Sequence, residues 1–326
     1  MKKSQISFGK ILNFISIIII LLLISMGSYF LYLNLPREAK SLNVEIEPIK
    51  EIEPLNIEIK QFYPNMKFNH NEISYLIENN CDDNKKQRMI IAFEELSKKV
   101  NIISFYPVAN NPDIEITCSK KNIVAGQESE QEKHFIAGEG GARKIIKTGA
   151  LNIITEGTIL LYDSNLKTIE CDYPNVELHE LMHVFGFDHV DDKRSLMYQY
   201  IESCDQILDL NIIEQLKQLY SQQNLPDLYF ENISAIKKGR YLDFNLTIIN
   251  SGSMDSGNAT LTILDNDEVV EETDLGVLKF GSGISLQTQN LKLIRLNPEK
   301  ISFIIDKENK IKEIDKKNNI AIVETD

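Results

Sequence analysis

Basic side chains are scarce in this chain of 326 residues. Lysine and arginine together number 35 against 48 aspartates and glutamates, which leaves a formal net charge of -13. An acidic chain gains nothing from contact with a phosphate backbone, so we exclude nucleic acid as a partner. Apolar residues make up an ordinary 43% of the chain, which is sufficient for a sizeable core and for more than one domain.

Cysteine is also rare, and no two of the four cysteines form a C-x-x-C pair. This spacing argues against a cysteine-rich structural zinc site. An even number of cysteines suggests two disulfides in a chain outside the cytoplasm, and three pairings are open. We favour Cys81–Cys118 with Cys171–Cys204, because the second bond would clasp the histidine motif described below. Four buried free thiols are the alternative.

Charged residues are absent from residues 11–33. A bilayer core needs about 20 apolar residues, so this run is long enough to form a transmembrane helix. Tyr29 and Tyr32 suit a membrane interface at its far end. We favour a retained signal anchor in the lipid bilayer, with residues 1–10 in the cytoplasm and the rest of the chain outside. Secretion after cleavage of a signal peptide is the alternative, because small residues stand near the end of the run.

Residues 34–56 follow this run and are acidic and rich in proline. Pro36, Pro48 and Pro54 interrupt an alternating stretch that contains Val44-Glu45-Ile46. Proline at this density favours an extended spacer over a helix. An edge strand added to the next domain is the alternative for part of this segment.

Residues 57–223 mix helical and strand patterns, which predicts an α+β domain. Helical spacing predicts a helix over Lys86–Val100 and a last helix over Leu210–Tyr220 that Asp209 could cap. Alternating or apolar runs predict strands at 100–105, 113–117 and 158–162. Residues 138–141 are rich in glycine but lack the spacing of a phosphate loop, so we expect a turn there.

Three of the five histidines stand in one segment, HELMHVFGFDH. His179 and His183 are four residues apart, so on a helix both imidazoles lie on one face and can bind one ion. Gly186 then stops the helix, because glycine tolerates positive φ, and the chain can return His189 as the third ligand. Three protein ligands leave one tetrahedral position open, as in catalytic Zn²⁺ sites.

Glu180 directly follows the first of these ligands. It is turned away from the line of ligands but stays close to the metal, where a base is needed to take a proton from water. The extended motif fixes five positions and is therefore much more specific than a lone H-E-x-x-H. A surface helix with scattered histidines is the alternative. We interpret the motif as one catalytic Zn²⁺ held by His179, His183 and His189, with Glu180 as general base.

Other candidate metal ligands have simpler explanations. His70 and His134 stand alone, and we expect them to be ordinary surface or core histidines. Asp191 and Asp192 carry the oxygen atoms that Ca²⁺ takes, but a solvated loop explains them better.

Met197 stands eight residues after His189, within Ser195-Leu196-Met197-Tyr198. Together with the zinc motif, this segment resembles the active-site helix and Met-turn of matrixin-type metzincins, the group that includes matrix metalloproteinases. Residues 111–116 and 208–220 resemble further parts of that fold. The resemblance implies a twisted mixed sheet above a cleft, a closing helix, Met197 beneath the metal, and an extended substrate beside the upper edge strand.

Two features depart from the matrixin pattern. Gln199 stands where matrixins usually have proline, which affects the wall of the apolar pocket. No cysteine-bearing inhibitory segment is visible before the domain, so latency is either absent or managed in another way.

Residues 224–326 change to short alternating strands separated by turns, which predicts an all-β, Ig-like sandwich. Pro226-Asp227-Leu228, Asn250-Ser251-Gly252 and residues 313–319 resemble adhesion-related, CARDB-like modules of prokaryotic surface proteins. Such a module implies spacing or a cell-surface partner rather than chemistry.

We therefore expect a membrane-anchored, extracytoplasmic zinc endopeptidase that acts on protein or peptide substrates. The rival interpretation is a non-catalytic surface adhesion protein with a structural metal site. Glu180 argues against the rival, because a purely structural site needs no base beside its ligands.

Overall fold

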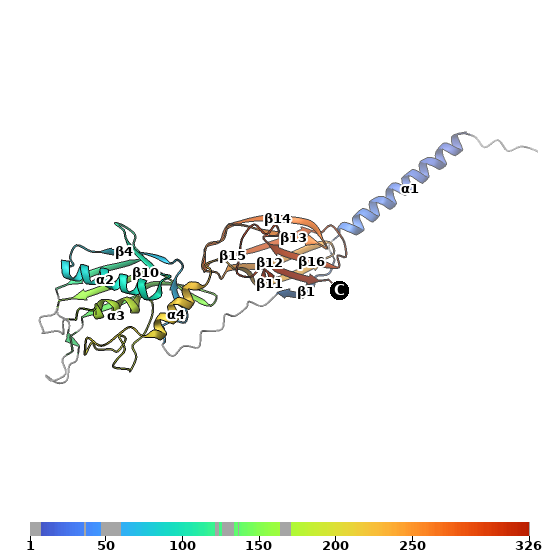
Figure 1. Ribbon diagram of the computed structural model, residues 1–326. Helices are drawn as coiled ribbons and strands as arrows, with labels where there is room; N and C mark the ends of the chain where they lie inside the picture. Colours follow the sequence, from blue (N-terminus) through green and yellow to red (C-terminus); the bar gives the residue numbers. More distant parts are fainter. Residues whose placement is uncertain are drawn as a thin grey trace, which may run out of the picture.

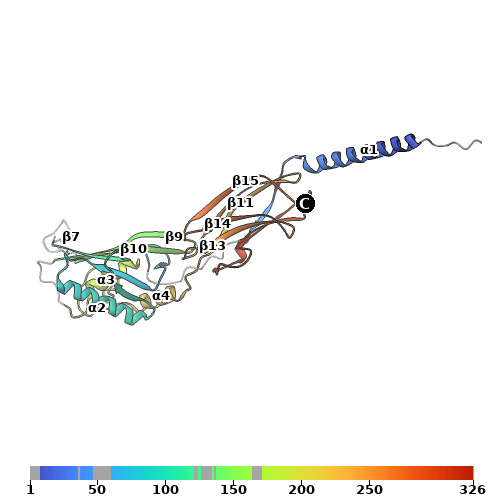
Figure 2. The ribbon, with the colours of Figure 1, turned by 90° about the horizontal axis from the view of Figure 1, so that it is seen from above.

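The computed structural model describes residues 8–35, 37–46, 60–120, 124–125, 134–135, 137–163 and 171–325. A helix, a β-sandwich and an α/β domain follow one another in space, and both views place the sandwich in the middle (Figure 1, Figure 2). Pro36, Pro48 and Pro54 of the predicted spacer lie outside the described residues, as do residues 1–7 of the predicted cytoplasmic segment.

The first element is the helix α1 (Phe8–Asn34), which contains the predicted apolar run. Leu12–Asn34 is long and apolar enough to cross a membrane, and it is the one such helix in the described part of the chain. None of the apolar window within it is buried against the protein. The apolar helix predicted from the sequence is confirmed.

The α/β domain is built on a mixed sheet with the strand order β9-β10-β6-β4-β5, and β3 lies beside the start of β10. All pairings are parallel except that of β9, which runs antiparallel to β10 at the edge of the sheet. A separate antiparallel pair joins β7 to β8. The bounds are β3 (Met66–Phe68), β4 (Glu72–Ile77), β5 (Ser104–Pro107), β6 (Ile114–Ser119), β7 (Val124–Ala125), β8 (His134–Phe135), β9 (Gly138–Thr148) and β10 (Leu151–Tyr162).

Three described helices cover one face of this sheet (Figure 2): α2 (Asp83–Val100), α3 (Asn175–Val184) and α4 (Leu210–Ser221). The buried face of α2 includes Met89, Phe93 and Leu96, as its spacing predicts. One apolar core joins all three helices to the sheet. The result is a two-layer domain with α3 packed against β9 and β10.

Three local predictions for this domain are wrong. The strand expected over residues 100–105 is β5, which starts later because Val100 still belongs to α2 and Asn101 ends that helix with a φ of 57°. Residues 138–141 begin β9 instead of a turn, because pairing with β10 supplies their hydrogen bonds. Asp209 precedes α4 without capping it, since its carboxylate accepts a hydrogen bond from the Ser195 hydroxyl instead.

The sandwich has two antiparallel sheets, with the strand orders β1-β11-β12-β15 and β14-β13-β16-β17-β2. Alternating apolar residues of both sheets form its core, which is separate from that of the α/β domain. The bounds are β11 (Leu228–Lys238), β12 (Tyr241–Asn250), β13 (Asn258–Asp265), β14 (Glu268–Val277), β15 (Gly283–Lys292), β16 (Lys300–Ile305) and β17 (Ile320–Glu324), with a short 3-10 helix over Lys317–Asn319.

The sandwich takes one strand of each sheet from the segment that precedes the α/β domain. β1 (Lys40–Leu42) pairs antiparallel with β11, and β2 (Val44–Ile46) pairs antiparallel with β17. Leu42 is buried in the sandwich core. The extended spacer predicted for residues 34–56 is therefore wrong for these strands, because the alternation in Val44-Glu45-Ile46 serves an edge strand. The α/β domain is inserted between strands of the sandwich.

Polar side chains join the two domains. The Lys67 ammonium donates to the carbonyl of Leu219 at 2.9 Å and to Oδ1 of Asn224 at 3.0 Å. The same Asn224 oxygen accepts from the Ser253 hydroxyl at 3.3 Å, and the Asn69 amide donates to the Ser253 carbonyl at 3.2 Å. Burial lowers the pKa of Lys67 to about 8. One lysine of β3 thus links the end of α4 to the linker that leads into the sandwich.

Candidate active site

The helix α3 is held at its start by Arg88 of α2. The Arg88 guanidinium pairs with the buried Glu177 carboxylate at 2.9 Å and donates to the carbonyls of Cys171 at 2.7 Å and Tyr173 at 3.2 Å. Charge-assisted hydrogen bonds of this kind are the stronger ones in proteins. The start of the helix is therefore fixed relative to the core beneath the sheet.

The chain turns sharply at Gly186, directly after α3. Gly186 has a φ of 86°, and its N–H donates to the His183 carbonyl at 3.0 Å, while the Phe187 N–H donates to the Met182 carbonyl at 3.1 Å. This pair of bonds is the Schellman arrangement that ends many helices. A Cβ atom at position 186 would lie 2.2 Å from Sδ of Met66, so both the backbone and the space require glycine.

The turn brings the three histidines of the motif together. Nε2 of His179 lies 3.0 Å from Nε2 of His183 and 3.2 Å from Nε2 of His189, and the last two nitrogens are also 3.2 Å apart. The imidazoles of His179 and His183 are buried, and that of His189 is exposed. Among the described residues this is the one group of three or more His, Cys, Asp or Glu side chains whose ligand atoms converge.

The hydrogen bonds of two rings decide which nitrogen faces the centre of this cluster. Nδ1 of His179 lies 2.7 Å from the Leu196 carbonyl, and Nδ1 of His183 lies 2.7 Å from the Phe187 carbonyl. Carbonyl oxygens only accept, so both Nδ1 atoms carry the proton and both Nε2 atoms are bare. Burial lowers the pKa of His179 to about 3, which keeps the ring neutral.

The bare Nε2 atoms of His179 and His183, which are 3.0 Å apart, repel each other unless a cation lies between them. Tetrahedral Zn²⁺ with bonds of about 2.0 Å separates its nitrogen ligands by about 3.3 Å, close to the observed spacing. The backbone carbonyls behind His179 and His183 are the second-layer partners that zinc-binding histidines usually have. The donor set and its geometry therefore fit a zinc ion with one open position.

The turn that contains Met197 lies directly behind His179. Met197 and Leu196 are fully buried in the core of the domain. The Met197 N–H donates to the Ser195 hydroxyl at 2.9 Å, and the Val190 N–H donates to the Met197 carbonyl at 2.9 Å. The turn thus contacts both the first histidine, through Leu196, and the segment that follows the third.

Glu180 lies between α3 and the edge strand β9, with only 6% of its surface exposed. The Gly140 N–H donates to its carboxylate. The pKa of Glu180 is raised to about 8, chiefly by burial, with a smaller contribution from Glu139 and Glu177 and against the opposing effect of the Gly140 bond. A Cβ atom at position 138 would lie 2.6 Å from Cγ of Glu180, and one at 140 would lie 2.1 Å from its carbonyl oxygen. Gly138 and Gly140 of β9 are therefore required for the close approach of α3.

Sequence reasoning missed the segment that enters the α/β domain. The Gln61 amide donates to the carbonyls of Phe185 at 2.8 Å and Met66 at 2.9 Å. The Phe62 N–H donates to the Gly186 carbonyl at 2.8 Å, and the exposed ring of Phe62 lies 6.1 Å from that of His183. This segment supports the turn between the second and third histidines. The partners are more than 120 residues apart, so no local pattern in the sequence points to them.

Two disulfides are present, Cys81–Cys118 and Cys171–Cys204. The first lies at the end of the sheet that holds β4 and β6. The second joins the residues just before α3 to the loop that follows the Met197 turn.

Two of the other candidate metal ligands bind other side chains: His70 bonds Asp113 at 3.0 Å, and the Asp192 carboxylate bonds Arg194 at 3.1 Å. The side chain of His134 lies outside the described residues.

A family model of matrixins matches residues 67–221. Residues 67–221 are a matrixin domain. Together with the three converging imidazoles, this match shows that the chain carries a matrixin zinc metallopeptidase domain. The mixed sheet, the active-site helix α3 and the closing helix α4 of the matrixin domain agree with the resemblance noted in the sequence.

A second family model, CARDB, matches residues 225–323, which form the sandwich. A CARDB domain of a Pyrococcus furiosus protein, solved in complex with two metal ions, is 16% identical, with a TM-score of 0.26 over 31% of this chain and 87% of its own. A domain of a putative cell surface protein from Methanosarcina acetivorans is 20% identical, with a TM-score of 0.25 over 31% of this chain and 92% of its own. No curated protein matches the chain.

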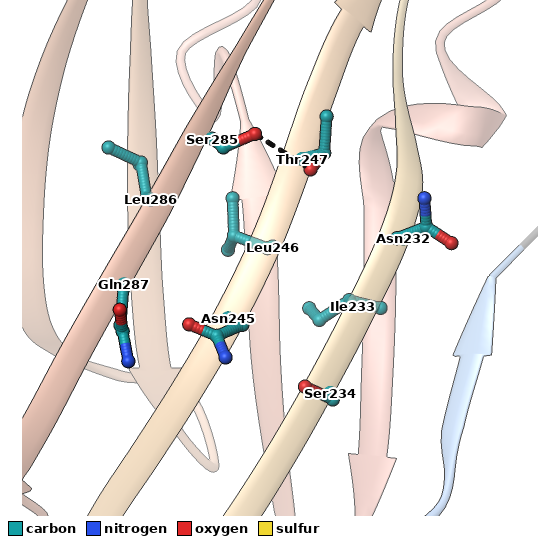
Figure 3. A pocket seen from close by; sticks show the side chains of 9 residues that line it. All are labelled: Asn232, Ile233, Ser234, Asn245, Leu246, Thr247, Ser285, Leu286 and Gln287. Carbon is teal, nitrogen blue, oxygen red and sulfur yellow. Dashed lines mark hydrogen bonds between the residues drawn. The ribbon is translucent and has the colours of Figure 1, made fainter.

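A shallow hollow of about 500 Å³ lies on the CARDB domain and contains none of the site residues (Figure 3). Its lining is uncharged and mixes polar with apolar side chains, and the Thr247 and Ser285 hydroxyls share a hydrogen bond at 3.0 Å between neighbouring strands. It is lined by β11, β12 and β15, through Asn232, Ile233, Ser234, Asn245, Leu246, Thr247, Ser285, Leu286 and Gln287.

Proposed function

We propose that this protein is a membrane-anchored, extracytoplasmic zinc metalloendopeptidase in which Glu180 is the general base. The observation that carries the proposal is the convergence of the Nε2 atoms of three imidazoles, at 3.0 to 3.2 Å, beside one buried carboxylate. A structural zinc site needs a closed ligand set and no base. Three ligands with an adjacent carboxylate favour hydrolysis.

In this proposal each residue of the site has a separate task. His179, His183 and His189 hold the zinc, and Leu196 fixes the orientation of the first ring. Zinc, when bound, polarises the scissile carbonyl and lowers the pKa of a coordinated water. Glu180 is ionised beside a divalent cation, takes a proton from the attacking water and passes it to the leaving amine. Met197 supports the floor of the site from the buried turn.

The edge strand β9 gives the substrate a place to lie. β9 pairs with β10 on one side, and no strand of the described residues pairs with its other side. An extended peptide can add to such an edge through main-chain hydrogen bonds. A substrate in this position runs past Glu180, because β9 contacts α3 at Gly138 and Gly140. This arrangement favours unfolded or extended segments of proteins as substrates.

The anchoring part of the proposal rests on α1 and on the disulfides. α1 is uncharged and predominantly apolar over a membrane-spanning length, and disulfides persist outside the cytoplasm. The amino-terminal mass of the mature protein and its behaviour on alkaline extraction of membranes test the anchor. An intact amino terminus in the membrane pellet supports it, and a soluble chain that lacks α1 supports secretion instead.

The catalytic part is tested by metal analysis together with cleavage of an unfolded protein. We expect one zinc per chain and cleavage that a chelator abolishes. Glu180→Gln should retain the zinc and lose about 100-fold or more of the turnover, because general bases contribute this much. His183→Ala should lose the zinc as well. Zinc without any cleavage by the native chain would instead support the rival adhesion protein with a structural metal site.

A further inference from the structure

Figure 1 shows α1 at one end of the sandwich. Basic residues gather at this end, where the turn at Gly239 packs on Leu35 and Arg37. Lys40 of β1 is directly opposite Lys237 of β11, and Lys292 of β15 is opposite Tyr241 of β12. The turn between β11 and β12 packs on the residues that follow α1. We call this group the basic collar, and it consists of Arg37, Lys40, Lys237, Arg240 and Lys292.

The collar places side chains of like charge next to one another. Cross-strand neighbours of the same charge destabilise a sheet, and Lys40 and Lys237 are such a pair. Burial lowers the pKa of Lys237, and the charges of Arg37 and Lys40 lower it further. A Cβ atom at Gly239 would lie 3.2 Å from Cγ of Arg37, which places that arginine on the same turn.

No carboxylate of the described residues lies within ion-pair distance of any collar residue. The neighbouring cations differ in this respect, because Lys238 pairs with Asp243 and Arg295 pairs with Asp265 and Glu268. The exposed Glu38 stands next to Arg37 in sequence without pairing with it. Nε of Arg240 is buried and has no hydrogen-bond partner in the described residues. Arg37 lies over the ring of Tyr32 at 4.8 Å, and the Arg240 guanidinium donates to the Ile294 carbonyl, so both have neutral partners. In a chain with a net charge of -13, this group of cations without a carboxylate partner is free to bind an external anion.

The position of the collar beside the end of α1 indicates which external anion it can bind. The membrane-length segment of α1 ends at Asn34, and Arg37 follows only three residues later. The Leu35 carbonyl lies 3.2 Å from the Cβ position of Gly239, so the turn between β11 and β12 touches the end of the helix. If α1 spans a bilayer, Leu35 and Arg37 lie at the depth of the lipid headgroups. The collar then lies at the same depth.

We propose that the basic collar binds anionic lipid headgroups of the membrane that α1 spans. The proposal rests on the anchoring put forward under Proposed function. Guanidinium and ammonium groups donate charge-assisted hydrogen bonds to headgroup phosphates. Binding at several collar residues holds this end of the sandwich against the membrane. The matrixin domain, at the opposite end of the sandwich, is then held away from the bilayer surface.

The test uses the full-length chain in vesicles of neutral phosphatidylcholine and in vesicles that also contain phosphatidylglycerol. The lysines are acylated by a water-soluble reagent, and the acylation rate of each lysine is measured by peptide mass spectrometry. We expect Lys40, Lys237 and Lys292 to react about fivefold more slowly in the anionic vesicles, which corresponds to about 1 kcal/mol. High salt should restore their rates. Lys98, exposed on α2 of the matrixin domain, is the matched control and should react equally in both.

Fluorescence quenching gives a second measurement, in which a charge variant is compared with the native collar. The chain has no tryptophan, so Ile294→Trp beside the collar and Tyr106→Trp in the matrixin domain are clean fluorescent probes. Lipids with brominated chains should quench the first probe more than the second in anionic vesicles. R37Q/K40Q/K237Q should reduce that difference, and K98Q/K99Q should not.

The outcomes separate the collar from the anchor. Loss of the chain from neutral vesicles on flotation contradicts the anchor. In that case, if the native chain still floats with anionic vesicles and R37Q/K40Q/K237Q does not, the result supports the collar. Flotation with both vesicles, with equal acylation rates and equal quenching, overturns the collar and leaves the anchor standing.

Discussion

The carbonyl oxygen of Leu196 accepts a hydrogen bond from Nδ1 of His179 at 2.7 Å. This bond connects the buried Met197 turn to the first of the three imidazoles. It fixes the tautomer of His179 and aims its bare Nε2 at the centre of the cluster. The turn is itself held by the Ser195 hydroxyl, which donates to the Asp209 carboxylate and accepts from the Met197 N–H. The zinc affinity of the matrixin domain should therefore depend on the Ser195 hydroxyl, although this group does not bind the metal.

Ser195→Ala is the variant that tests this dependence. The loss of both bonds loosens the turn and leaves the Asp209 carboxylate without its partner. We expect zinc affinity to fall about tenfold, the lower end of the effect of changing a second-layer residue. Competition with a coloured chelator measures it. Ser203→Ala, in the exposed part of the same loop, should leave the affinity unchanged. Equal affinity of both variants and the native chain would show that the turn does not support His179.

Gly140→Ala tests the close contact between β9 and α3. The new Cβ atom would lie 2.1 Å from the Glu180 carbonyl oxygen, so the strand or the helix must move. We expect a loss of stability of about 2 kcal/mol and a loss of most of the turnover, because the shift displaces Glu180. Gly141→Ala is a matched control, since nothing lies within 4 Å of its Cβ position. Thermal unfolding and cleavage of an unfolded protein, measured on both variants, decide the point.

The histidine cluster was predictable because local rules alone place its parts. A helical spacing of four puts His179 and His183 on one face, and Gly186 can adopt the positive φ that returns His189. The periodicity of α2 and the alternation in the sandwich strands were readable for the same reason. These signals depend on neighbours in the sequence and not on distant partners.

The features that could not be predicted depend on contacts far apart in the sequence. Gln61 supports the zinc turn through Phe185, 124 residues away. Glycine has a low propensity for strands, so the glycine-rich start of β9 reads as a turn until β10 and Glu180 are placed beside it. β1 and β2 have three residues each, and the alternation in Val44-Glu45-Ile46 allowed an edge strand of the next domain. Their partner strands β11 and β17 follow the matrixin domain in the sequence, so no local pattern showed that they pair with the sandwich instead.

Leu42→Ala tests the unexpected role of these two strands. Leu42 is buried in the CARDB core although it precedes the matrixin domain in sequence. Truncation of a buried leucine costs about 2 to 5 kcal/mol, so the CARDB domain should lose stability while the matrixin domain keeps its own. Hydrogen exchange should accelerate in β11 and β17 and stay unchanged in β10. Ser41→Ala, at the exposed neighbouring position, should change neither. Faster exchange confined to β10 would contradict the strand pairing.

Lys67→Met tests the buried ammonium between the domains. Its pKa is lowered from 10.5 to about 8 by burial, so between these values the unfolded chain binds more protons than the folded chain. The free energy of unfolding should therefore rise with pH in this window, by at most about 1.4 kcal/mol per pH unit. The rise should be absent in Lys67→Met and present in Lys98→Met. Urea unfolding at pH 8, 9 and 10 measures the difference, and parallel curves for all three chains would contradict it.

The two disulfides offer a comparison in which loop length is nearly constant. They close loops with sequence separations of 37 and 33 residues. The entropy lost by the unfolded chain depends on loop length, so removing either bond should cost a similar amount, about 4 kcal/mol. Stability alone therefore cannot distinguish a bond that supports the metal site from one that does not.

Zinc affinity should distinguish them. Cys171–Cys204 joins the start of α3 to the loop after the Met197 turn, so it restrains two of the segments that position the imidazoles. C171S/C204S should weaken zinc binding about tenfold, the lower end of the effect expected when support around the ligands is lost. C81S/C118S should retain the native affinity, because that bond joins the loop after β4 to β6 and belongs to neither segment. Competition titrations below the unfolding temperature of both variants provide the measurement. Equal weakening in the two variants would mean that general stability, and not the clasp around α3, sets the affinity.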